Sequence, residues 1–322
     1  MSIRRFVVVE ESMLPGLAPG DEFVATDARL PASGDVVVFP HPSRDNFWLV
    51  KRMAAGPGEE AGGHRLGEDE AWVISDNLDA TRADSRTLGP IPFASLWVRV
   101  TSLDAGTFGD AAILLADEEP ALGLIVDEWG LPPFWQRQPG FSTLVLLILE
   151  QQVSLESGAA MFRRLLDLVD VVTAKTVLEA GDTGLRSIGV TRQKVGYLLG
   201  LAEAVSGGEL DLDALPQTTE PDARARLIAL KGIGLWTADA YLLSALRLPD
   251  VFPVGDRALQ VGTMEALGLD AVPGPSQLET ISAPWRPVRA VAARLIWHRY
   301  LSTRGRVEPP DPVAGHVVND PA

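Results

Sequence analysis

Residues 230–238 read Leu230-Lys231-Gly232-Ile233-Gly234-Leu235-Trp236-Thr237-Ala238. Apolar residues at helical spacing lie on both sides, so this stretch predicts a helix that ends at Leu230 and a second helix that starts near Trp236. The two glycines permit a tight turn and a close backbone approach. The stretch is therefore either an ordinary helix joint with a glycine C-cap or a helix–hairpin–helix, which points backbone N–H groups at a phosphate. The second interpretation makes DNA contacts of Lys231, Gly232, Gly234 and Thr237.

An acidic residue follows the hairpin about 20 residues later, in the stretch Val251-Phe252-Pro253-Val254-Gly255-Asp256-Arg257-Ala258-Leu259. Asp256 occupies the entry from a loop into the next predicted helix. An aspartate is expected there for structural reasons alone, because its side chain caps free N–H groups of the first turn. Capping is therefore one interpretation of Asp256, and chemistry beside the hairpin is the other.

Several segments together resemble one family. The hairpin, Asp256 and the segments 149–154, 192–198 and 285–292 occur in the order found in the helix–hairpin–helix DNA glycosylase superfamily, and they are most similar to its 3-methyladenine branch. The resemblance covers residues 121–300. It implies an all-α domain that excises alkylated bases from damaged double-stranded DNA by base flipping, with Asp256 as the catalytic carboxylate.

The residue after the hairpin refines this prediction. Members of the superfamily that also cut the strand carry a lysine where this chain has Trp236. The resemblance therefore implies a monofunctional glycosylase, in which Trp236 stacks on the extruded base, whose positive charge favours a π face. Core packing is the alternative for Trp236. Gln152 and Tyr241 are predicted to complete the base pocket, and the sequence leaves Trp135, Trp285 and Trp297 open between pocket and core.

The N-terminal third has a different pattern. Short β-branched or aromatic runs occur at residues 6–9, 22–25, 35–39, 47–51, 72–74 and 96–100, separated by Gly, Pro and Asp. Such runs predict a small β-sandwich or barrel-like domain. The chain is thus expected to be multidomain, with a mostly-β domain before an all-α domain.

Two residues of the β-rich part suggest catalysis. Ser12 precedes a predicted strand, and Lys51 follows the apolar residues 47–50. A serine hydroxyl is a poor nucleophile until a base takes its proton, and a lysine amine is a base only where burial lowers its pKa. Lys51 has a plausible setting for that role.

These residues and two later segments resemble a second family. Ser12, Lys51, Ser75-Asp76-Asn77 and Asp84-Ser85-Arg86 occur in the order of the type I signal peptidase family. The resemblance implies a peptidase-like domain with Ser12 as nucleophile, Lys51 as general base and a peptide substrate. Glu10 departs from the family, which usually has Gly or Ser there, and its carboxylate would repel a developing oxyanion.

The expected organisation is a peptidase-like β domain at 1–104, a linker at 105–120, a glycosylase domain at 121–306 and a disordered tail at 307–322. Ala105-Gly106 in that linker also raises the hypothesis of self-cleavage by the Ser12/Lys51 dyad, as in repressors of the DNA-damage response. Two further alternatives stay open. The chain is a soluble processing peptidase whose helical half binds DNA or targets the enzyme, or it is a DNA-binding module with neither activity.

Composition limits the remaining classes. The 322 residues carry 28 Lys and Arg against 43 Asp and Glu, for a net charge of −15, which argues against non-specific coating of nucleic acid. Cysteine is absent, which excludes disulfides, thiolate metal sites and iron–sulfur clusters. No apolar run is long enough for a membrane span or a signal peptide. We expect a cytoplasmic protein with no cofactor, no metal and no membrane partner.

Overall fold

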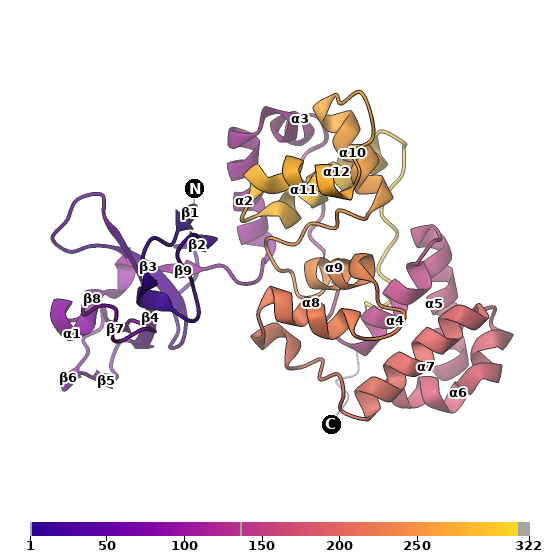
Figure 1. Cartoon of the computed structure of the whole chain (residues 1–322), viewed down its shortest axis with the longest axis horizontal. Coiled ribbons are helices and arrows are strands. Elements are labelled where there is room, and N and C mark those ends of the chain that lie inside the picture. The colour runs from indigo at the N-terminus through magenta and orange to yellow at the C-terminus, as the bar shows by residue number, and fades with distance from the viewer. Residues whose placement is uncertain (1, 136, 315–322) are drawn as a thin grey trace. The chain divides into compact units, whose positions relative to one another are not determined.

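The computed structural model describes residues 2–135 and 137–314. The chain divides into two compact units (Figure 1). The first unit runs to Leu114 and also takes in Trp285–Val288, and the second comprises the rest of the chain. The first unit holds the strands and the second is helical, so the prediction of a β-rich part followed by an all-α part is confirmed.

The β-rich unit is built on one antiparallel sheet with strand order β1-β2-β9-β3-β4-β7-β8. A separate hairpin pairs β5 with β6. The strands are β1 (Ile3–Val7), β2 (Glu22–Thr26), β3 (Val36–Pro40), β4 (Trp48–Ala55), β5 (Glu60–Ala61), β6 (His64–Arg65), β7 (Glu70–Ile74), β8 (Ile91–Pro92) and β9 (Trp97–Arg99). Three short helices join them, namely η1 (Glu11–Met13), α1 (Ser85–Leu88) and η2 (Phe93–Ser95).

The sheet is apolar on both faces. Neighbouring residues of β3 show this, because Phe39 belongs to one buried cluster and Val38 to another. Alternate residues of β4 are buried, and Leu49, Lys51 and Met53 therefore share the same inward face. The two-residue period of the strand is thus what buries the amine of Lys51.

The helical unit contains α3 to α12. Its helices are α3 (Pro120–Trp129), α4 (Phe141–Glu150), α5 (Leu155–Val169), α6 (Ala174–Ser187), α7 (Arg192–Ser206), α8 (Glu220–Ile228), α9 (Leu235–Ser244), α10 (Arg257–Leu267), α11 (Pro275–Ser282) and α12 (Arg289–Ser302). Two single turns, η3 (Leu215–Gln217) and η4 (Ala283–Trp285), complete the element order.

The helix α4 is the centre of this unit. Its residues 143–150 are all buried, and it packs against α5, α7 and α9. The helix α12 packs against α3 and α10. Figure 1 shows α3, α10, α11 and α12 gathered at one end of the helical unit and α4 to α9 at the other. Among the described residues, no helix is both long and apolar enough to cross a membrane.

The segment 105–120, expected to be a linker, is helical. It forms α2 (Ala105–Glu118) and the first turn of α3. The side chains of Phe108, Ala111, Ala112 and Leu115 are buried at helical spacing, and this outweighs the acids and glycine that indicated a loop. Ala105-Gly106 lies in the first turn of α2. A pair of residues held in a helix is not an extended peptide, which contradicts the self-cleavage hypothesis at that position.

The expected disordered tail is wrong for residues 307–314. Val313 is buried, and Glu308 forms an ion pair with Arg294 at 2.6 Å between Oε2 and Nη1. Three prolines in this segment favour an extended backbone without excluding specific contacts. The rest of that prediction, residues 315–322, lies outside the described residues.

Candidate functional site

The predicted hairpin joins α8 to α9 at residues 229–234. Gly232 has φ +98°, and a Cβ built there would lie 2.2 Å from Cγ of Tyr197, so only glycine fits this position. Gly234 is the N-cap of α9 and supplies no side-chain hydrogen bond to the helix. Lys231 is exposed beside it. The hairpin therefore presents a helix N-terminus without a side-chain cap, as a phosphate site requires.

Gln151 joins the hairpin to the end of α4. Its Nε2 donates to the carbonyl of Gly232 at 2.8 Å and to Oγ1 of Thr237 at 2.9 Å. Lys194 Nζ donates to the carbonyls of Leu149 and Gln151 at 2.7 and 2.9 Å, which holds the C-terminal end of α4 in place. Thr237 is buried, and its Oγ1 already accepts the hydrogen bond from Gln151; its side-chain contact with DNA stays a prediction.

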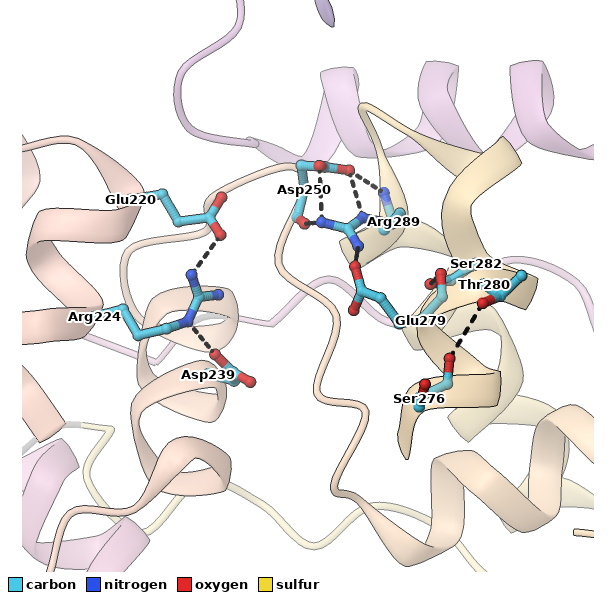
Figure 2. A network of polar contacts seen from close by, with 9 residues as sticks. All are labelled: Glu220, Arg224, Asp239, Asp250, Ser276, Glu279, Thr280, Ser282 and Arg289. Carbon is cyan, nitrogen blue, oxygen red and sulfur yellow. Dashed lines mark hydrogen bonds and ion pairs between the residues drawn. The ribbon is translucent and has the colours of Figure 1, made fainter. Parts of the chain in front are cut away.

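An ion pair connects the two helices of the hairpin. Arg224 on α8 donates from Nε to Oδ1 of Asp239 on α9 at 2.7 Å, and its Nη1 lies 2.9 Å from Glu220 (Figure 2). Burial raises the pKa of Asp239, and the Arg224 guanidinium opposes this shift. The hydrogen-bonded geometry of the pair fixes the angle at which α9 leaves the turn.

A second arginine holds the loop that leads to Asp256. Arg289, at the start of α12, donates from Nε and Nη2 to the two carboxylate oxygens of Asp250, each at 3.0 Å, and from Nη1 to Glu279 at 2.8 Å (Figure 2). A bidentate contact of this kind sets both distance and orientation. The loop therefore begins at a fixed point six residues before Asp256.

The Asp256 carboxylate is held by three N–H donors. Asp256 is the N-cap of α10, as predicted, and its Oδ1 accepts from the backbone N–H of Leu259 at 2.7 Å. The same oxygen accepts from Nε1 of Trp297 at 2.9 Å, and Oδ2 accepts from Nε1 of Trp236 at 2.8 Å. Capping and side-chain chemistry thus meet in one residue, since the cap uses only one of the two oxygens.

A cavity of about 410 Å³ lies next to this carboxylate. Asp256, Trp135, Trp236 and Trp297 line it, and its volume lies in the range of small-molecule sites. The rings of Trp135 and Trp297 have centroids 5.5 Å apart and are tilted by 54°. The cavity therefore combines aromatic walls with the carboxylate of Asp256, which is held between Trp236 and Trp297.

The structure sorts the other residues predicted for the base pocket. Gln152 is exposed in a turn with φ +58° and does not line this cavity. Tyr241 is fully buried, and its hydroxyl accepts from the N–H of Gly140 at 2.8 Å, so it is a core residue. Trp285 is likewise buried and away from the cavity lining, whereas Trp135 and Trp297 belong to it. The placement of Gln152 and Tyr241 in the pocket was therefore wrong.

The β-rich unit brings the predicted dyad together. Lys51 Nζ donates to Oγ of Ser12 at 2.9 Å and to the carbonyl of Val50 at 2.9 Å. Ser12 lies in η1, and its own carbonyl accepts from the N–H of Asn77 at 3.0 Å. Both side chains are buried. Two residues 39 positions apart thus form a hydrogen-bonded pair.

The charges around this pair have defined partners. Burial lowers the pKa of Lys51, and the carboxylates of Asp84, Glu10 and Asp76 oppose that shift. Although burial opposes it, hydrogen bonds from Arg86 and Ser75 lower the pKa of Asp84 to about 2. Glu10 is exposed beside η1. The amine is therefore a stronger candidate for a general base than an ordinary lysine. Across residues 2–135 and 137–314, no group of three or more His, Asp or Glu is placed to hold a metal ion.

Sequence reasoning missed three contributors. Gln151 contacts the hairpin, whereas the prediction named its neighbour Gln152 and placed that residue in the base pocket; residue type does not distinguish the two. Arg294 and Glu308 line the cavity from α12 and from the C-terminal segment. The only signal for this pair was the cluster of arginines near the end of the chain, which did not point to a partner.

The chain matches two families. HhH-GPD superfamily base excision DNA repair proteins match residues 145–287, and the signal peptidase family, peptidase S26, matches residues 1–62. A DNA-3-methyladenine glycosylase of Bacillus subtilis (strain 168) is 32% identical over 115 residues, which cover 36% of this chain and 38% of the relative. The chain thus spans less than half the length of that relative.

Two further proteins extend the comparison. The structure of a DNA-3-methyladenine glycosidase from Bacillus halodurans aligns with a TM-score of 0.53 at 27% identity, over 61% of this chain and 91% of that one. The mitochondrial ATP-independent inner membrane protease subunit 2 of Arabidopsis thaliana is 31% identical over 109 residues, which cover 29% of this chain and 53% of the relative. The helical part of the chain therefore resembles HhH-GPD superfamily base excision DNA repair proteins in sequence and fold, and its N-terminal part resembles signal peptidases.

Proposed function

We propose that the helical unit is a monofunctional DNA glycosylase that excises alkylated bases of the 3-methyladenine type from duplex DNA in base excision repair. The observation that carries this proposal is the Asp256 carboxylate, held between Trp236 and Trp297 at the wall of an aromatic cavity. Damaged double-stranded DNA is the partner that such a site serves. With chromosomal DNA as substrate, we place the protein in the cytoplasm.

The chemistry follows from charge development at the sugar. The C1′–N bond of the extruded nucleotide breaks, the base leaves with the bonding electrons, and the sugar becomes oxocarbenium-like. The Asp256 carboxylate stabilises that positive charge, and water then adds to C1′ and releases a proton. The products are the free base and an abasic site. No amine stands at position 236, so the strand is not cut by a Schiff-base route.

The hairpin supplies the grip on the duplex. The N-terminus of α9 carries no side-chain cap, and exposed Lys231 adds one positive charge beside Gly232 and Gly234. We assign the phosphate contact to these three residues. Few basic contacts on a chain of net charge −15 imply weak non-specific binding.

The proposal is tested by base release from methylated duplex DNA at low and moderate salt. Wild type is expected to release methylated purines and leave the strand intact until alkali is added. Asp256→Asn is expected to abolish release, while Ser12→Ala, in the other unit, leaves it unchanged. Absence of release by wild type at both salt concentrations would refute the proposal. Borohydride trapping of a covalent DNA adduct would refute its monofunctional part.

A second activity is favoured by the Ser12/Lys51 pair, and we propose a serine endopeptidase function for the β-rich unit. The amine of Lys51 accepts the proton of Ser12, whose oxygen attacks a peptide carbonyl and forms an acyl-enzyme with release of the new amine. Water then hydrolyses the ester. The exposed carboxylate of Glu10 opposes the negative charge that develops on the carbonyl oxygen, which makes this activity slow.

Two variants test the peptidase on a mixture of unstructured peptides. Glu10→Ser is expected to raise turnover, and Ser12→Ala in the same background is expected to abolish it. An unchanged rate in Glu10→Ser/Ser12→Ala relative to Glu10→Ser would show that Ser12 is not the nucleophile. If peptidase activity is found without base release, the role of the helical unit is DNA binding or targeting of the peptidase. If neither activity is found, its role is DNA binding alone.

A further inference from the structure

The C-terminal segment forms one wall of the aromatic cavity. Residues 306–313, called the strap below, leave the end of α12 as the yellow trace of Figure 1. Arg306, Val307, Glu308 and Pro309 line the same cavity as Asp256. Val313 at the far end of the strap is buried and anchors it. A segment expected to be disordered is therefore part of the pocket.

Glu308 is the residue through which the strap engages the pocket. Its two carboxylate oxygens accept from Nε1 of Trp135 at 2.9 and 3.1 Å, and Oε2 lies 2.6 Å from Nη1 of Arg294. The Arg294 guanidinium carbon in turn lies 4.2 Å from the centroid of the Trp135 ring. One carboxylate thus fixes an aromatic wall and pairs with the cation stacked on it.

The charges that line the cavity come in equal numbers. Among the described residues, four arginines face four carboxylates, namely Arg137, Arg257, Arg294 and Arg306 against Glu150, Glu156, Asp256 and Glu308. Glu150 is paired with Arg137 at 3.1 Å. Glu308 is the only one of the four carboxylates that the strap supplies. Without it, the guanidinium of Arg294 faces the cavity uncompensated.

We propose that Glu308 is a specificity-determining residue, which cancels the charge of Arg294 at the pocket wall and so admits a cationic base. This inference rests on the proposed function, because it assigns the cavity to the extruded base. A cationic methylated base and its neutral parent differ little in shape, so the charge of the wall separates them. Arg294 is buried and Glu308 is half-buried, so water screens their charges less than it would at the surface, which strengthens the effect.

A series of variants that differ in the charge of the pocket wall tests the proposal. Arg294→Met lowers the charge of the wall by one, Glu308→Gln raises it by one, and the double variant restores the balance. The probes are 1-methyladenosine, which is cationic at neutral pH, and adenosine, with binding followed by quenching of tryptophan fluorescence in the full-length protein. We expect the affinity for 1-methyladenosine divided by that for adenosine to be highest in Arg294→Met and lowest in Glu308→Gln. Wild type and the double variant are expected to lie between them. Each step is about tenfold for a unit charge about 10 Å away at an effective dielectric of about 20.

The controls separate charge from structure. Glu209→Gln removes an exposed carboxylate outside the cavity lining and is expected to leave the ratio unchanged. If Glu308 has a purely structural role, Glu308→Gln weakens the binding of both nucleosides equally. An affinity ratio that does not change with the charge of the pocket wall would overturn the proposal. No binding of either nucleoside by wild type would overturn it as well.

Base release is measured on the same proteins, so that the two proposals fail separately. If wild type releases the base but the affinity ratio does not follow the charge of the pocket wall, the role of Glu308 is overturned and the proposed glycosylase activity is supported. If the affinity ratio follows the charge of the pocket wall but wild type releases no base, the role of Glu308 in binding is supported and the proposed catalytic function is overturned.

Discussion

Replacing Asp256 by asparagine is expected to destabilise the protein as well as remove a charge. Asp256 accepts three hydrogen bonds, two on Oδ1 from Leu259 and Trp297 and one on Oδ2 from Trp236. Asparagine offers one acceptor oxygen and one NH₂ group. The favoured orientation keeps the oxygen on the side of the two donors. Its NH₂ group then faces Nε1–H of Trp236, and two donors meet.

The magnitude follows from these contacts. Each retained bond loses its charge assistance, at about 1 kcal/mol, and the indole N–H of Trp236 loses its acceptor, at about 1–2 kcal/mol because it is only partly buried. The total is about 3–4 kcal/mol of unfolding free energy. Trp236→Phe removes the opposing donor. The cost of Asp256→Asn is therefore expected to shrink by about 1–2 kcal/mol in the Trp236→Phe background.

The assay is a double-mutant cycle of urea unfolding with the wild type, the two single variants and the double variant. Asp211→Asn is the matched control. Asp211 accepts two backbone N–H groups, and both bond to the same oxygen, so asparagine keeps them. We expect Asp211→Asn to change the unfolding free energy by less than about 0.5 kcal/mol.

Two results would refute this reasoning. A coupling free energy near zero between positions 236 and 256 would show that the NH₂ group does not meet the indole. A cost of Asp256→Asn no larger than that of Asp211→Asn would show that the three bonds do not act together. Base release separates the roles further, because the double variant is expected to release no base even though Asp256→Asn costs less stability in the Trp236→Phe background.

Three more predictions concern other parts of the molecule. Burial lowers the pKa of Lys51, so between that lowered pKa and the ordinary pKa of an amine the unfolded chain binds one proton more than the folded chain. The stability of the fold therefore rises with pH over this range. Lys51→Met is expected to remove this rise when thermal unfolding is measured as a function of pH. Gly232→Ala is expected to cost about 2–4 kcal/mol because of its backbone conformation and a clash, against about 1 kcal/mol or less for Gly234→Ala, and equal costs in urea unfolding would contradict this. Arg289→Gln is expected to lower the unfolding free energy by about 3 kcal/mol, because it removes the bidentate contact with Asp250. A clearly smaller loss measured by calorimetry would contradict this prediction.

Local rules predicted the parts of the site that depend on local structure. An aspartate before an apolar helical run predicted the N-cap at Asp256, and the glycine pair predicted the hairpin. The inward position of Lys51 follows from strand periodicity, and the resemblance to signal peptidases linked it with Ser12. In each case one chain segment, or one family pattern, contained the information.

The errors have a common physical cause, which is packing between distant segments. Gln151 and Gln152 are chemically identical, and only the turn at φ +58° decides which of them faces the hairpin. Tyr241 is in the core because its hydroxyl finds the N–H of Gly140, 101 residues away. Glu308 finds Trp135 across 173 residues. Periodicity and residue type do not encode such partners.

The way in which Asp256 is held has a consequence for the electric field in the cavity. Guanidinium groups cancel the charges of Glu150 and Glu308, whereas Asp256 is fixed by an amide and two indoles, which carry dipoles and no net charge. A carboxylate oriented by dipoles keeps its whole negative charge directed into the site, and its surroundings need not reorganise when positive charge appears. Of these three carboxylates, Asp256 is thus the source of an uncancelled field, already in place before the bond breaks.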